Sequence, residues 1–151
     1  MKLDRMTNPD RRTPHSAARG RFRRGVETVE LAVALPVLLF VLFAGFEFGW
    51  ALLRSIQIDH AARVGAREAA LYGSSTISVQ DRILANLKEV GIGTATITIS
   101  PADPGIADPG EPISVEVLVD YDDVQLLGLS GLMPLPDSLR GRASMVKEPE
   151  S

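Results

Sequence analysis

One segment of the sequence is longer and more apolar than a helix of a soluble protein needs to be. Residues 31–53 contain one charged residue, Glu47, in 23 positions. A helix of that length reaches about 34 Å at a rise of about 1.5 Å per residue, enough to cross a hydrocarbon core of about 30 Å. Over residues 31–46 every face is apolar, which is typical of a helix surrounded by lipid. The sequence therefore predicts a transmembrane helix, with bounds at residues 26–53.

The two flanks differ in charge and predict how this helix is oriented. Residues 1–25 hold eight Lys and Arg against two Asp, whereas residues 54–151 hold eight Lys and Arg against 14 Asp and Glu. Basic residues next to a membrane helix remain on the cytoplasmic side. We therefore expect a cytoplasmic basic leader at residues 1–25 and an extracytoplasmic domain at the other end. Orientation explains arginines beside a membrane helix better than nucleic-acid binding does, so no nucleic-acid partner is expected.

A cleaved secretory signal is the other interpretation of a basic start followed by an apolar run. The apolar core of such a signal is typically about 7–15 residues long, which is shorter than the run found here. Its cleavage site also needs small residues, and Leu42-Phe43-Ala44 has leucine where one is required. A helix that stays in the membrane is therefore the favoured interpretation.

Carboxylates stand at the beginning of the apolar run. Glu30 opens it, Glu27 lies one turn earlier, and Gly25 separates both from the basic leader. An ionisable residue within a membrane helix costs free energy and is by default a functional hypothesis. An ammonium about 4 Å away would compensate the carboxylate, because opposite charges attract much more strongly away from water. Glu30 is therefore a candidate functional residue.

The sequence around these residues resembles a family of pilus-assembly proteins. The similarity is to the TadE-like pseudopilins of tight-adherence (Flp) pili, which are type IV pilin-like proteins of the bacterial inner membrane. It rests on residues 24–32 (RGVETVELA), Ala34-Leu35-Pro36, Phe46-Glu47-Phe48-Gly49 and residues 61–70. The resemblance implies a non-enzymatic minor pseudopilin with a role in pilus assembly, secretion and cell adhesion.

The resemblance also assigns roles to individual residues. It implies that a prepilin peptidase cleaves between Gly25 and Val26, so that Glu30 becomes the fifth residue of the mature chain. Glu30 would then set the register by meeting the N-terminal ammonium of a neighbouring subunit. Leu31 follows it, where the family usually carries phenylalanine. The implied partners are membrane lipid, the prepilin peptidase, other pilins or pseudopilins and the pilus assembly platform.

The helix is expected to continue outside the membrane over residues 54–73. Small residues recur there on one side, including Ala61, Gly65 and Ala69, and allow another element to approach closely. Two interpretations stay open: this side contacts neighbouring pseudopilins, or it carries the chain's own outer domain. Glu47 also has two interpretations. Either it contacts a partner, or its carboxylate reaches water at the outer interface, and the second interpretation is favoured.

Residues 74–151 predict a small domain, which together with the long first helix gives a pilin-like α+β fold. A capping box at Ser78-Val-Gln-Asp81 indicates a short second helix that ends before Gly91. Alternating apolar residues indicate an antiparallel sheet of about three strands. These strands are expected at residues 94–100, 113–120 and 139–147. The apolar connection at residues 124–136 is expected to pack beneath the sheet rather than to lie on the membrane surface.

Patterns typical of catalysis or metal binding are missing from the sequence. It contains no cysteine and two histidines, His15 and His60, which are far apart. Asp120, Asp122 and Asp123 are the ligand type that calcium prefers, but their spacing matches no EF-hand. We therefore expect no enzyme activity, no cofactor and no metal. The alternative to a pseudopilin is a single-pass, membrane-anchored extracytoplasmic binding module unrelated to pili.

Overall fold

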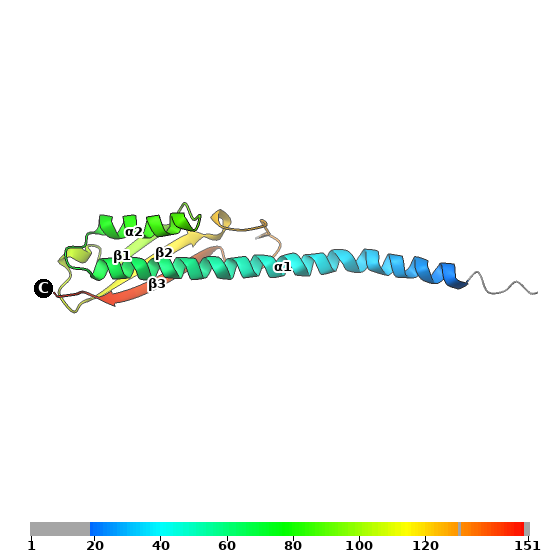
Figure 1. Cartoon of the computed structure of the whole chain (residues 1–151), viewed down its shortest axis with the longest axis horizontal. Helices are drawn as coiled ribbons and strands as arrows, with labels where there is room; N and C mark the ends of the chain where they lie inside the picture. Colours follow the sequence, from blue (N-terminus) through cyan, green and yellow to red (C-terminus); the bar gives the residue numbers. More distant parts are fainter. Residues whose placement is uncertain (1–18, 130, 150–151) are drawn as a thin grey trace, which may run out of the picture. The chain divides into compact units, whose positions relative to one another are not determined.

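The computed structural model describes residues 19–129 and 131–149, with side chains from residue 25 onward. This part of the chain contains the helices α1 (Arg19–Ala70) and α2 (Thr76–Glu89) and the strands β1 (Thr96–Ser100), β2 (Pro112–Asp120) and β3 (Ser138–Val146) (Figure 1). Two short 3-10 turns, η1 (Pro104–Ile106) and η2 (Tyr121–Asp123), flank β2. The predicted α+β fold, with a long first helix, a short second helix and a small antiparallel sheet, is confirmed. Residues 1–18 of the expected leader lie outside the described residues.

The chain divides into two compact units, and their boundary falls between Val41 and Leu42. The first unit contributes the N-terminal part of α1. Every described side chain from Val26 to Val41 is exposed, and most of them are apolar. Among the described residues, one helix, Gly25–Ala70, is long and apolar enough to cross a membrane. Apolar residues on every face suit lipid or another apolar environment, not water.

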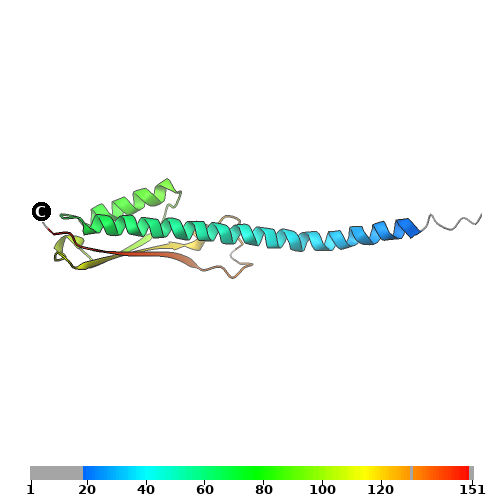
Figure 2. The ribbon, with the colours of Figure 1, turned by 60° about the horizontal axis from the view of Figure 1, so that its bottom comes forward.

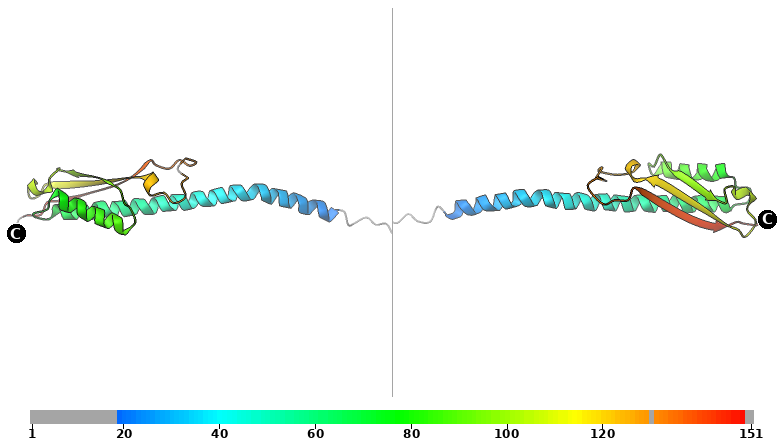
Figure 3. Two further views of the ribbon diagram at one scale, coloured as in Figure 1. Left: turned by 90° about the horizontal axis from the view of Figure 1, so that it is seen from above. Right: turned by 180° about the vertical axis from the view of Figure 1, so that it is seen from behind.

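The second unit has one hydrophobic core, which forms where α1 and α2 lie on the same face of the sheet (Figures 2 and 3). Mostly small residues of α1 let the helix approach the strands closely. We call α2 and the sheet the C-terminal domain. The fully buried hydrophobic residues of α1 are Ile58, Ala61, Ala62, Ala66 and Ala69, and those of α2 are Val79, Ile83 and Leu87.

Helix α2 begins earlier than the sequence indicates. Its N-cap is Ser75, whose hydroxyl accepts a hydrogen bond from the Ser78 amide at 3.1 Å, while the Ser78 hydroxyl accepts one from the Ser75 amide at 3.1 Å. The predicted capping box from Ser78 to Asp81 is therefore wrong, because Ser78 is the third residue of the first turn. Ser75 offers the same kind of hydroxyl group three residues earlier. The helix begins directly after Ser75 and is therefore longer than predicted.

The end of α2 lies where the sequence predicts it. Gly91 has a φ of +77°, a conformation that glycine adopts without strain. The Gly91 amide donates to the Lys88 carbonyl at 3.0 Å, and the Ile92 amide donates to the Leu87 carbonyl at 2.9 Å. This is a Schellman motif, which satisfies the last carbonyls of a helix.

The sheet is an antiparallel meander in the order β1-β2-β3, and its strands lie within two residues of the predicted bounds. The predicted inward side of β2 is confirmed. Gly141 of β3 pairs with Val117 of β2 and faces the backbone of α1. A Cβ at Gly141 would lie 2.6 Å from the Ile58 carbonyl oxygen, so a glycine is required where β3 crosses α1. The buried side chains of β2 are Ile113, Val115, Val117 and Val119.

Residues near the end of the chain cap the last turn of α1. The Lys147 ammonium donates to the Leu71 carbonyl at 2.7 Å and to the Ser74 hydroxyl at 3.0 Å. The Glu148 amide donates to the Ala70 carbonyl at 2.9 Å. A cation is favoured at a helix C-terminus because it satisfies free carbonyls and complements the helix dipole. Lys147 is only 5% exposed, so this cap is part of the packed structure.

Candidate functional site

The residues expected to be processed and to set the register lie on an exposed part of α1. Gly25, Val26, Glu30 and Leu31 all belong to the first unit, and the structure leaves each of them exposed. A Cβ added at Gly25 would meet no described atom within 4 Å. Val26 and Glu30 are four residues apart, so they lie one turn apart on the same helix face. This surface is open to a protease or to a neighbouring helix.

Glu47, the other acid of the predicted transmembrane segment, is fully buried within the second unit. The Tyr121 hydroxyl donates to its Oε1 at 2.7 Å. The Leu126 amide donates to Oε1 at 3.2 Å and the Leu127 amide to Oε2 at 2.8 Å. We call this arrangement the Glu47 clamp. The interpretation favoured from the sequence, a carboxylate that reaches water, is wrong. Other parts of the second unit cover Glu47 and satisfy both of its oxygens.

Two further side chains of α1 form hydrogen bonds with backbone carbonyls of the segments that pack beside the helix. Trp50 Nε1 donates to the Val124 carbonyl at 2.7 Å. The Arg54 guanidinium lies over the Trp50 ring, 4.4 Å from its centroid, and donates to the Val90 carbonyl at 2.6 Å. Residues 47, 50 and 54 have helical i, i+3 and i+7 spacing and share one face of α1. That face therefore fixes both the segment after η2 and the end of α2.

Tyr121 is the side-chain donor of the clamp and is 1% exposed. Burial raises the pKa of the Tyr121 hydroxyl, and the hydrogen bond to the Glu47 carboxylate and its negative charge raise this pKa further. An elevated pKa keeps the phenol protonated well above neutral pH. Tyr121 therefore remains a hydrogen-bond donor to Glu47 under physiological conditions.

The small residues at Ala61, Gly65 and Ala69 lie in the core of the second unit. Ala61 and Ala69 are fully buried, and a Cβ at Gly65 would overlap the Ile83 side chain of α2. Of the two interpretations that the sequence leaves open, the structure shows the packing of the chain's own domain. In this arrangement the three residues are not accessible to a neighbouring subunit.

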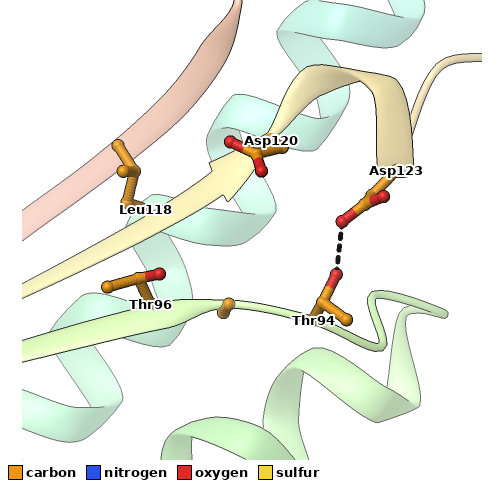
Figure 4. A pocket seen from close by; sticks show the side chains of 6 residues that line it. Thr94, Thr96, Leu118, Asp120 and Asp123 are labelled. Atoms are coloured by element: carbon orange, nitrogen blue, oxygen red, sulfur yellow. Dashed lines mark hydrogen bonds between the residues drawn. The ribbon is translucent and has the colours of Figure 1, made fainter.

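A small pocket near the junction of β2 and η2 is lined by Thr94, Asp120 and Asp123 (Figure 4). The Thr94 hydroxyl donates to Asp123 Oδ2 at 2.6 Å. Within the described part of the chain, no group of three or more His, Cys, Asp or Glu residues is placed to hold a metal ion. The pocket gives no basis for a metal site or a catalytic site.

The Glu47 clamp is the feature that the sequence did not predict. Its donors lie 74 to 80 residues away from Glu47 along the chain. One signal was present, because an acid within an apolar helix needs a donor, and a tyrosine that follows a buried strand can supply one. No spacing rule connects two positions so far apart.

Comparison with known protein families supports the resemblance. A family model described as TadE-like protein matches residues 25–67. The match begins at Gly25, includes Glu30 and Glu47, and leaves out α2 and the sheet. No curated protein and no solved structure matches the chain. The resemblance of this segment to TadE-like proteins is confirmed, and a TadE-like segment indicates a role related to the Tad pilus.

Proposed function

We propose that this protein is a non-enzymatic minor pseudopilin that acts in the assembly of a tight-adherence (Flp) pilus. In this proposal α1 is anchored in the bacterial inner membrane, the basic N-terminus is cytoplasmic, and the C-terminal domain is outside. The observation that carries the proposal is the TadE-like match over residues 25–67. It begins at the glycine that is expected to precede the cleavage site.

The exposure of the first unit supports this function. All described side chains from Val26 to Val41 are exposed, so every face of this part of α1 is available to lipid and to neighbouring helices. In contrast, the buried contacts of α1 in the second unit begin at Glu47. Helix α1 thus has one exposed segment that serves lateral contacts and a second segment that packs against the C-terminal domain.

The register of assembly is proposed to depend on two charges. A prepilin peptidase hydrolyses the amide bond between Gly25 and Val26, which gives Val26 a free ammonium. The Glu30 carboxylate of one subunit pairs with the Val26 ammonium of the next, because either charge alone would be strongly unfavourable within the membrane. Leu31, which is 63% exposed, adds apolar contact beside this pair.

The test is co-expression with a prepilin peptidase, followed by N-terminal sequencing and intact-mass measurement of the membrane-extracted protein. We expect a chain that starts at Val26. A chain that keeps its full mass beside an active peptidase would contradict the proposal and would favour a membrane-anchored binding module.

Assembly is tested separately with Glu30→Ala and the matched control Glu27→Ala, which removes an exposed carboxylate one turn earlier. Glu30→Ala should abolish cross-links between subunits in membranes, whereas Glu27→Ala should retain them. Equal cross-linking in both variants would exclude a register role for Glu30.

A further inference from the structure

The connection between η2 and β3, residues 124–136, combines an apolar composition with exposed side chains, and we call it the leucine loop. It contains no charged residue. Part of it packs on the domain as predicted, since Val124 and Met133 are buried. Leu126 and Leu127 are each 46% exposed, however, and Leu132 is 72% exposed. Leucines exposed together in an uncharged loop are unfavourable in water and point to a partner surface.

Hydrogen bonds tie this loop to a defined position on α1. The amides of Leu126 and Leu127 bind the Glu47 carboxylate at 3.2 and 2.8 Å. On α1, Glu47 stands between Phe46 and Phe48, which are 57% and 51% exposed. Leu126 and Leu127 therefore lie at the same level along the helix as the exposed Phe46 and Phe48.

We propose that the leucine loop inserts its leucine side chains into the membrane–water interface beside α1, as a second contact of this chain with lipid. The occupant follows from continuity, because the Glu47 clamp holds Leu126 and Leu127 beside the exposed Phe46 and Phe48 of the apolar stretch of α1. Trp50, whose indole binds the loop at Val124, is the residue type enriched at such interfaces.

The Glu47 clamp removes the main obstacle to this location. A carboxylate near lipid is unfavourable unless it is hydrogen-bonded, and free backbone amides are unfavourable there as well. Glu47 and the amides of Leu126 and Leu127 satisfy each other, so this carboxylate and these two amides are paired where they approach the bilayer. The proposal rests on the insertion of α1 in a membrane, which is part of the proposed function, and does not depend on leader cleavage or pilus assembly.

The chain contains no cysteine, so single nitroxide labels can be placed cleanly in the full-length protein in phospholipid vesicles. Leu127→Cys and Leu132→Cys report on the loop. Ile106→Cys is the matched control, since Ile106 is an apolar residue on η1 that is 78% exposed, and Val41→Cys reports on the apolar helix. Collision with a water-soluble nickel complex should be about tenfold less frequent at residues 127 and 132 than at residue 106, because the polar complex is excluded from apolar surroundings.

The outcomes distinguish this proposal from the function on which it rests. Protection at residue 41 together with full access at residues 127 and 132 would overturn the loop insertion and leave the membrane helix standing. Access at residue 41 as well would overturn both. Spin–spin broadening at residue 132 that persists on dilution in lipid would show that a second copy covers the loop, which also overturns the proposal.

A measurement on the unmodified chain guards against a disturbance by the labels. Trp50 is the single tryptophan of the chain and is bound to the loop at Val124. Lipids brominated near the headgroup should quench its fluorescence more strongly than lipids brominated near the ends of the acyl chains. Absence of quenching by either lipid would contradict the insertion of the loop.

Discussion

Glu47 shows how a charged side chain is accommodated in a stretch of α1, residues 31–53, that is otherwise uncharged. Desolvation of a carboxylate costs several kcal/mol unless hydrogen bonds compensate for the lost water. Here three donors replace the water, and all of them come from the short stretch 121–127. That stretch can satisfy Glu47 only when it is folded against α1. The carboxylate therefore couples the position of the loop to the position of the helix.

Tyr121→Phe should lower the free energy of unfolding by about 1–3 kcal/mol, because a buried charged acceptor loses one of its donors. Unfolding in detergent micelles, followed by Trp50 fluorescence, measures this loss. In the Glu47→Met background the same substitution should have little effect, and an equal loss in both backgrounds would contradict the role of the clamp. The difference in free energy of unfolding between the unmodified protein and Tyr121→Phe should be constant below about pH 10. It should decline at higher pH, because the unfolded state loses its phenolic proton before the folded state does.

At this scale the sequence identifies the exceptional residues but not their contacts. Glu30 and Glu47 stand out because each is a charge in or beside an apolar run. The sequence alone cannot show that the structure leaves Glu30 exposed and surrounds Glu47 with donors. That difference depends on which part of α1 the C-terminal domain covers.

At the scale of elements, the helices and strands follow from local patterns in the sequence. The alternation in residues 113–119 places four side chains on one face of β2, and all four are buried. The beginning of α2 is the exception, because Ser75 and Ser78 both fit the pattern of an N-cap. Only the contacts of the folded chain decide between two caps of similar quality.

Two glycines hold neighbouring elements close to α1, and they should respond differently to the same substitution. Gly65→Ala should lower the free energy of unfolding by about 1–3 kcal/mol, because the added methyl group overpacks against the Ile83 side chain. In the Ile83→Ala background the same methyl group fills the space that is left, so Gly65→Ala should become neutral or stabilising there. Gly141→Ala meets the backbone of α1 instead, and Ile83→Ala should not rescue it.

Denaturant unfolding of the single and double variants measures this difference. If Gly65→Ala lowers the free energy of unfolding equally in the unmodified protein and in the Ile83→Ala background, the close contact of α1 with α2 is contradicted.

At the scale of the whole molecule, the two units differ in which residues they expose and which they bury. The first unit keeps the TadE-like residues around Gly25 and Glu30 exposed, while the second unit buries Ala61, Gly65 and Ala66 of the match in its core. In the proposed assembly, contacts between subunits and stability of the domain therefore rest on different residues. This division was not predictable from the sequence, which left open whether the small residues of α1 serve a neighbour or the chain itself.

Glu30→Ala should accordingly leave the unfolding of the second unit unchanged within about 0.5 kcal/mol, because exposed residues outside a packed unit contribute little to its stability. Trp50 lies in the second unit and reports on its unfolding directly. A clear loss of stability in Glu30→Ala would show that any assembly defect of this variant comes from misfolding.

The cap that Lys147 provides has a consequence for the order of folding. The carbonyls that it binds, those of Ala69 and Leu71, lie 78 and 76 residues earlier in the sequence. Until β3 has docked and brought Lys147 into place, the last turn of α1 lacks its cap, and we expect it to fray. The end of the first helix therefore becomes stable only when the sheet is complete.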